Sequence, residues 1–213
     1  RDIEELANLG IVAKVLRGAI YVPSKESLSE SPLVARQNEN LAAKRAIANA
    51  ALKLVKPSKT LFIDASTTCI EFARLLAQSD LHVTVVTNSI LVSACFTEHP
   101  SISLIQLGGA VNVHNSCTTG SGVERAAKGY FFDFGFFSTL GYVHGQGTFE
   151  SSLDISGVKQ AFAAQCKEVI LLADHTKFGR RALNQVFADQ QIHKIITDRK
   201  SDDTADPRLL VAS

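Results

Sequence analysis

The chain has 213 residues, of which 46% are hydrophobic and 20% charged. This composition is that of a globular protein and excludes general disorder. The 22 Lys and Arg residues nearly balance the 21 Asp and Glu residues, for a formal net charge of +1. That balance excludes a protein that binds nucleic acid over its whole surface. It does not exclude a single local basic element.

No apolar run reaches the roughly 18 residues that a membrane span needs, and the opening residues lack a signal-peptide pattern. We therefore expect a cytoplasmic protein without membrane contact. The four cysteines form no CxxC motif and the six histidines no HxxxH motif. The nucleotide and nucleophile motifs GxGxxG, GxxxxGK[ST] and GxSxG are also missing. We predict free thiols, no metal site, no cofactor and no catalytic residue of these classes.

The N-terminal segment combines a short helical stripe with a basic hairpin. Lys14 and Arg17 place positive charge on a tight turn between two strand-like runs. A short helix followed by such a hairpin is typical of the end of a winged helix-turn-helix, which binds DNA. We therefore interpret residues 1–22 as the remnant of a DNA-binding domain that contacts DNA through Lys14 and Arg17. Residues 23–33 are rich in Ser and Pro and predict a linker.

Residues 34–213 alternate between short apolar runs and amphipathic helical patterns. Continuous apolar strands separated by helices indicate an α/β domain, with a mostly parallel sheet and helices on both faces. We expect strands at 60–64, 83–87, 102–107, 131–139, 168–173 and 194–197, with 131–139 near the centre. We expect helices at 40–56, 69–76, 90–96, 123–128 and 158–165.

Three successive hydroxyl residues follow the first of these strands. The strand ends at Asp64, and Ser66, Thr67 and Thr68 open the next helix. In parallel sheets, ligands bind outside the carboxyl ends of the strands. Hydroxyl groups and unpaired backbone N–H groups at a helix N-terminus form an anion site without any lysine. Simple capping of the helix is the alternative interpretation.

The other strands also end in residues that suit a ligand. Asn88 follows the second strand and either binds a ligand hydroxyl or caps the next helix. Gly108 and Gly109 follow the third strand, where they permit close backbone approach or form a turn. Lys177 follows the strand at 168–173, as a counter-charge for an anion or as a solvated loop residue. Together these residues predict a site for a small, polar, phosphorylated molecule.

The order of several short motifs resembles that of the DeoR family of bacterial transcriptional regulators. The motifs are AAKRAIANAA, LFIDASTT, VTVVTNS, LGGAV, DFGFFSTLG, VKQAF and LLADHTKFG, and RDIEELANLGIVAKVLRGA is similar to the end of the family's DNA-binding domain. The resemblance covers nearly the whole chain. It implies an effector domain similar in fold to sugar-phosphate isomerases, glucosamine-phosphate deaminases and CoA transferases. It also implies a repressor whose affinity for operator DNA changes when a phosphorylated sugar or polyol binds.

The resemblance also assigns roles to particular residues. The family's phosphate loop matches Asp64, Ser66, Thr67 and Thr68, although the family usually has Gly where Ser66 stands. The family often carries acidic residues where this chain has Ile155-Ser156-Gly157, so the contacts of that segment are open. Its other pocket positions match Thr87, Asn88, Gly108, Gly109, Gly141, Lys159, Asp174 and Lys177.

Two other functions compete with the regulator. An isomerase or deaminase on the same fold would use His144 and Glu150 as acid and base. The helix and hairpin at the N-terminus favour a regulator over such an enzyme. A purely structural oligomerisation domain would not need the convergent polar loops. Because helix-turn-helix regulators bind paired half-sites, we expect a homodimer or a tetramer held together by the effector domain.

Overall fold

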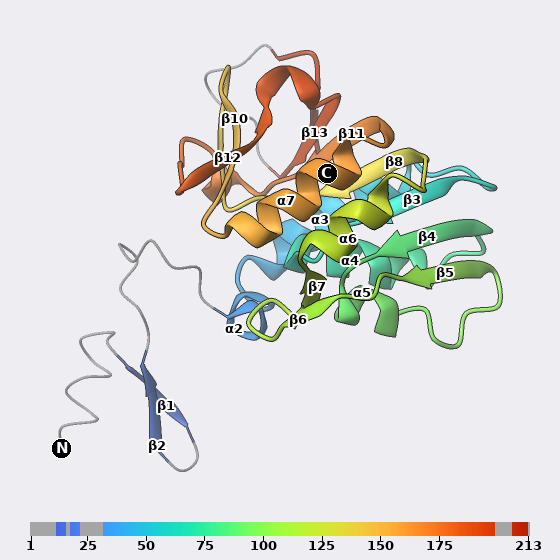
Figure 1. Ribbon diagram of the computed structural model, residues 1–213. Coiled ribbons are helices and arrows are strands. Elements are labelled where there is room, and N and C mark those ends of the chain that lie inside the picture. Colours follow the sequence, from blue (N-terminus) through green and yellow to red (C-terminus); the bar gives the residue numbers. More distant parts are fainter. Residues whose placement is uncertain (1–11, 16–17, 22–31, 199–205, 213) are drawn as a thin grey trace.

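A seven-stranded parallel sheet forms the centre of the molecule (Figure 1). The computed structural model describes residues 12–15, 18–21, 32–198 and 206–212. The strands follow the order β14-β13-β11-β8-β3-β4-β5, and every neighbouring pair is parallel. Their bounds are β3 (Thr60–Ile63), β4 (Val83–Thr87), β5 (Ile102–Gln106), β8 (Phe132–Phe137), β11 (Cys166–Leu172), β13 (Lys194–Thr197) and β14 (Leu209–Val211). The aromatic strand β8 lies in the middle, as predicted.

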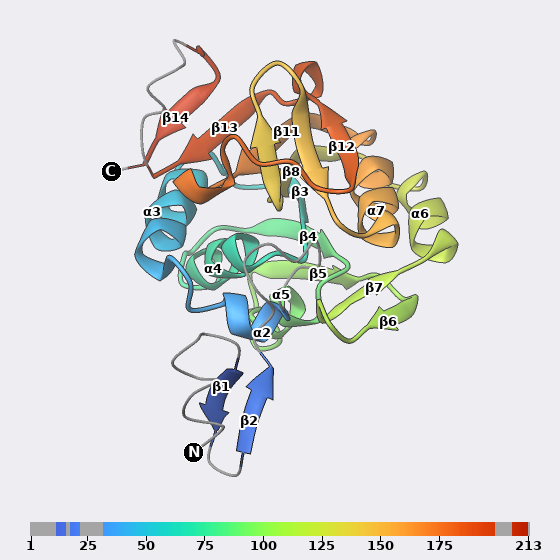
Figure 2. The ribbon, with the colours of Figure 1, turned by 90° about the vertical axis from the view of Figure 1, so that its left-hand side faces the viewer.

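Helices cover both faces of this sheet, which confirms the predicted fold class (Figure 2). One face carries α3 (Leu41–Leu52), α4 (Thr67–Leu76) and α5 (Ile90–Ala94). The other face carries α6 (Ser121–Ala127) and α7 (Leu153–Ala163). Among the described residues, no helix is both long and apolar enough to cross a membrane.

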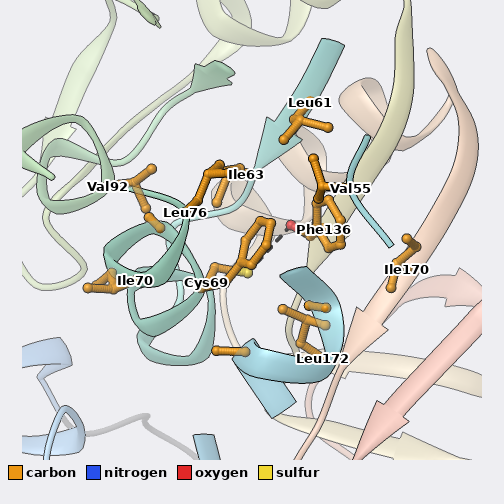
Figure 3. Close-up of a cluster of buried hydrophobic side chains, with 14 of the residues drawn as sticks. Val55, Leu61, Ile63, Cys69, Ile70, Leu76, Val92, Phe136, Ile170 and Leu172 are labelled. Carbon is orange, nitrogen blue, oxygen red and sulfur yellow. Dashed lines mark hydrogen bonds between the residues drawn. The ribbon is translucent and has the colours of Figure 1, made fainter. Parts of the chain in front are cut away.

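Two hydrophobic clusters, one on each face, hold the layers together. On the α4 face, the ring of Phe136 lies 4.3 Å from that of Phe72, and the Cys69 thiol donates to the Phe136 carbonyl over 3.5 Å (Figure 3). On the other face, Phe62 stacks on Phe162 at 4.4 Å. Each of these phenylalanine side chains is fully buried, and burial of one contributes about 1.5–3 kcal/mol to folding.

Two helices begin earlier than their apolar patterns predict. In α4 the Ser66 hydroxyl accepts a hydrogen bond from the Cys69 N–H, so the helix includes both threonines. Ser152 caps α7 in the same way, so this helix begins at Leu153 and not at residue 158. In both cases a side-chain cap extends the helix into a polar stretch that carries no apolar periodicity.

A small antiparallel sheet was not predicted. It consists of β9 (Gly141–Val143), β10 (Gly147–Glu150) and β12 (Asn184–Ala188), in the order β12-β10-β9. Its strands have only three to five residues, which is too short for an alternating pattern to be recognised in the sequence. A second hairpin joins β6 (Ala110–Asn112) to β7 (Cys117–Thr119). The remaining short helices are η1 (His175–Lys177) and η2 (Asp189–Gln191).

The N-terminal part contains an antiparallel hairpin of β1 (Val12–Val15) and β2 (Gly18–Tyr21), in which Lys14 pairs with Ala19. The predicted first helix, Arg17 and most of the predicted linker lie outside the described residues. The helix α2 (Leu33–Arg36) begins at Leu33, the last residue of that linker, which is fully buried in the core.

Candidate functional site

The strand order reverses between β3 and β8, and a cavity opens at this point. The chain leaves β3 through α4 on one face and leaves β8 through α7 on the other. Because the two connections diverge, they leave a crevice at the carboxyl ends of the strands. The cavity there has about 520 Å³ of empty space, part of it open to solvent. It is lined by Arg36, Asp64, Ala65, Ser66, Thr67, Thr68, Asn88, Asn115, Cys117, Ser138, Thr139, Glu150, Ile155, Lys159 and Lys177.

The N-terminus of α4 forms one wall of the cavity. The Ser66 hydroxyl is engaged as the cap of the helix. The hydroxyls of Thr67 and Thr68 face the same cavity, and neither has a hydrogen-bond partner among the described residues. The positive end of the helix dipole and the first-turn N–H groups add to this wall. The wall can therefore bind an anion through hydroxyl and backbone donors.

Positive charge reaches the cavity from two sides. Lys177, at the end of η1, lines the cavity, and its side-chain ammonium forms no hydrogen bond or ion pair with another described residue. Arg36, at the end of α2, donates a hydrogen bond of 2.7 Å to the Asn115 side chain. With Lys159 there are three cations against the carboxylates of Asp64 and Glu150, so the lining carries one excess positive charge.

Lys159 is held between two buried carboxylates. Its ammonium group lies 2.5 Å from Glu150 Oε1 and 3.3 Å from Asp64 Oδ2, and it donates to the Ser138 carbonyl over 2.7 Å. The three charged side chains are each no more than 5% exposed. The charge of Lys159 is therefore balanced within the protein, which leaves Lys177 as the better partner for a bound anion.

Asn88 presents an unsatisfied acceptor to the cavity. Its side-chain nitrogen donates to the Thr118 carbonyl over 2.9 Å, which fixes the orientation of the amide. Its Oδ1 atom is buried and has no partner among the described residues. A buried acceptor without a donor costs about 1–3 kcal/mol, which a ligand hydroxyl would recover.

Two predicted residues at strand ends serve the fold and do not line the cavity. The Thr87 hydroxyl donates to the Ile63 carbonyl over 2.6 Å and accepts from the Ser89 N–H over 3.0 Å. The Asp174 carboxylate accepts from the backbone N–H and the hydroxyl of Thr176, which caps η1. Both side chains fix the loops from which their neighbours reach the cavity.

The three predicted glycines also lie outside the lining. Gly108 and Gly109 are exposed in the turn between β5 and β6. A Cβ at Gly109 would lie 2.4 Å from the Val123 side chain, so this position needs glycine for packing. A Cβ at Gly141 would lie 2.3 Å from the Arg180 carbonyl oxygen, where β9 passes the loop after η1.

The sequence does not indicate several of the lining residues, and the structure separates two residues that were expected to act together. Arg36 and Asn115 come from short elements that carry no motif. Glu150 lines the cavity, but its expected acid/base partner His144 does not; His144 lies 3.5 Å from Asp206. No group of three metal-ligating side chains is gathered within the described ranges.

Comparison with known proteins identifies the kind of domain to which this cavity belongs. The family model described as the DeoR C terminal sensor domain matches residues 39–199. An uncharacterized HTH-type transcriptional regulator of Bacillus subtilis, YulB, is 30% identical over 93% of this chain and 75% of its own length. The L-fucose operon activator of Haemophilus influenzae is 29% identical over 95% of this chain and 80% of its own. A putative aga operon transcriptional repressor of Escherichia coli O157:H7 is 26% identical over 92% and 73%.

Solved structures share the fold at low sequence identity. Ribose 5-phosphate isomerase A of Methanocaldococcus jannaschii superimposes with a TM-score of 0.50 at 17% identity, over 66% of this chain and 55% of that one. The eIF2B delta subunit of Chaetomium thermophilum gives 0.53 at 11% identity, over 76% and 57%. These likenesses confirm the predicted isomerase-like fold and show no more than the fold.

Proposed function

Since the chain belongs to the DeoR family of transcriptional regulators, with a DeoR sensor domain over residues 39–199, we propose that its cavity binds a phosphorylated sugar or polyol. Binding then changes the affinity of the protein for operator DNA. The observation that carries the proposal is the α4 N-terminus, where two unpaired threonine hydroxyls share a cavity with Lys177. The relative named after an L-fucose operon supports a sugar-derived effector.

The polar groups of the cavity suit the two ends of such a ligand. Donors gather at the α4 N-terminus and at Lys177, where a phosphate would accept hydrogen bonds. Asn88 Oδ1 is an acceptor on a neighbouring strand end and would take a sugar hydroxyl. We propose Thr67, Thr68, Asn88 and Lys177 as the main contacts.

We propose that the domain is a sensor and not an enzyme. Enolisation of a sugar phosphate needs a carboxylate base that is available to the substrate. The two carboxylates in the cavity share the ammonium group of Lys159, and His144 lies elsewhere. The relatives are named as regulators, repressors or activators, which also supports this reading.

A thermal-shift screen tests the proposed ligand class. The chain is heated with a panel of sugar phosphates and with each parent sugar plus inorganic phosphate as the matched control. A ligand at about 100 times its dissociation constant adds roughly 2.7 kcal/mol of stability, which is readily measured. A panel in which no phosphorylated compound stabilises the protein more than its control would contradict the proposal.

We further propose that residues 1–22 are the end of a winged helix-turn-helix, that a linker follows and that the effector domain begins at Leu33, one residue before the predicted boundary, because Leu33 is buried in the core. The HTH-type names of the relatives support this division. In helix-turn-helix proteins base-specific contacts come from the recognition helix, and we propose that residues 1–22 do not supply them. This chain should therefore bind operator DNA only weakly and in a salt-sensitive manner. Nanomolar, sequence-specific binding in a mobility-shift assay would overturn the division.

We also propose that the effector domain self-associates into a dimer or a tetramer. Paired half-sites require at least two copies of the DNA-binding domain, and the N-terminal remnant is too small to hold them together. Light scattering at micromolar concentration tests this proposal. A monomer, with and without sugar phosphate, would refute it.

A further inference from the structure

The short helix α2 brings an arginine into the effector cavity. Arg36 is its last residue and lines the cavity, together with Asn115 from the loop between β6 and β7. The guanidinium donates to Asn115 Oδ1 over 2.7 Å, and Asn115 is only 6% exposed. An arginine presents five donors in a planar fork that matches phosphate oxygens. Arg36 therefore has the chemistry and the position of an anion ligand.

The position of α2 in the chain gives the Arg36 contact a second role, beyond that of one more donor to the ligand. This helix begins at Leu33, the last residue of the predicted linker, and is the first described element after the N-terminal hairpin. Its first residue, Leu33, is fully buried, and the Leu33 N–H donates to the His114 carbonyl over 3.1 Å. At its other end, the Lys44 ammonium donates to the Arg36 carbonyl over 2.6 Å. The helix is thus held at its first residue by the β6–β7 loop and at its last residue by α3.

Lys44 connects the end of α2 electrostatically to Lys177. Burial, and then the positive charge of Lys177, lowers the pKa of the Lys44 ammonium, whereas Asp174 and Glu39 raise it and Arg36 lowers it. Lys44 itself does not line the cavity. An anion bound at Lys177 would offset the repulsion between the two ammonium groups.

We infer that α2 reports the occupancy of the cavity to the N-terminal segment, with Arg36 as the residue that contacts the phosphate of the effector. The inference rests on the proposed function of the cavity and adds the residue through which binding is transmitted. In the structure the Arg36 guanidinium donates to Asn115. A bound phosphate competes for the same guanidinium, so the position and the stability of α2 depend on the ligand.

Hydrogen exchange with inorganic phosphate as the probe tests the inference directly. In the unmodified chain, phosphate should slow amide exchange both at residues 66–70 and at residues 33–40, because both segments become more ordered. Arg36→Gln should weaken phosphate binding by about 10- to 100-fold, as expected for a lost hydrogen bond to a charged group. At matched occupancy it should keep the protection of 66–70 and lose that of 33–40.

Two further variants separate a role in binding from a role in folding. Arg36→Lys keeps the charge but not the planar fork, so its affinity should lie between those of the unmodified chain and Arg36→Gln. Arg45→Gln removes an arginine that is 61% exposed and pairs with Glu71, outside the cavity, and should change neither readout.

The possible outcomes distinguish the inference from the proposal on which it rests. Phosphate protection at 66–70 without any at 33–40 in the unmodified chain would overturn the inference and leave the proposed function in place. Unchanged affinity and unchanged protection in Arg36→Gln would overturn it as well. Absence of protection at 66–70 would overturn both.

Discussion

The buried ion pairs of Lys159 with Asp64 and Glu150 allow a direct test of how much they contribute to the free energy of unfolding. In Lys159→Met the side chain keeps its length, but Asp64 and Glu150 lose the cation that lies 3.3 and 2.5 Å from them. Removal of one partner from a buried ion pair costs about 3–5 kcal/mol, because the remaining charge stays uncompensated. Domains are stable by about 5–15 kcal/mol in total, so Lys159→Met should lose a large part of the free energy of unfolding.

The double variant Lys159→Met with Glu150→Gln should be much more stable than Lys159→Met alone. It removes one charge of each sign, and Asp64 retains the hydrogen bond from the Ser138 N–H at 3.3 Å. Replacement of both members of a buried pair by neutral groups is often nearly neutral. We expect the double variant to lie within about 2 kcal/mol of the unmodified chain, with a favourable coupling energy of about 1–3 kcal/mol between the two sites.

Urea denaturation of the two single variants and of the double variant measures this cycle. Protein concentration is held constant, because self-association shifts apparent stability. Lys159→Met with a loss below about 1 kcal/mol, or strictly additive single changes, would refute the argument. The double variant also carries a second readout. Because Lys177 and the α4 wall remain intact, it should still be stabilised by sugar phosphates, and loss of that response would show that Lys159 or Glu150 contacts the ligand.

Three other predictions concern two residues of the cavity and the ion pair between Arg208 and Asp206, whose charged groups lie 2.6 Å apart. Thr67→Val keeps the shape of the side chain but removes a donor, and calorimetry should show binding weakened by about 1–3 kcal/mol, whereas unchanged affinity would contradict the phosphate position. Lys177→Ala should reduce the response to a phosphorylated sugar more than to its unphosphorylated form, and equal losses would show a structural role. The Arg208 guanidinium holds the pKa of Asp206 below its usual value, so this pair stabilises the fold above the ordinary carboxyl pKa and loses that effect as the pH falls through the lowered value. Asp206→Asn should therefore flatten the loss of stability in urea titrations between about pH 4 and pH 2, whereas the exposed Asp80→Asn should leave the curve unchanged.

The parts of the site that could be predicted from the sequence share one physical basis. The carboxyl ends of parallel strands meet at one edge of a sheet, so residues just after each strand converge. Thr67, Thr68, Asn88 and Lys177 indeed line one cavity. Thr87 follows the same rule but lies outside the lining, because its hydroxyl bonds to the neighbouring strand and to the following turn. The sequence thus predicts which residues stand at the strand ends, but it does not predict which groups their side chains bond to.

The residues that were missed come from elements whose position depends on long-range contacts. Arg36 and Asn115 meet because α2 packs against the β6–β7 hairpin, far along the chain, and neither segment has a distinctive periodicity. Glu150 belongs to the small antiparallel sheet, and its pattern did not indicate a strand. Local sequence rules describe short-range geometry, so contacts between such segments stay hidden from them.

Charge pairing supports the prediction that Lys177, rather than Lys159, is the main partner of the proposed ligand. Both Lys159 and Lys177 match pocket positions of the family by resemblance. A lysine buried at 4% exposure needs a compensating anion, and Glu150 and Asp64 supply it. Lys177 stays half-buried at the rim, where its charge has no counterpart among the described residues. An incoming phosphate therefore meets a site in which one cation is already neutralised and the other is not. The strength of its attraction depends on Lys177, on Arg36 and on the α4 dipole.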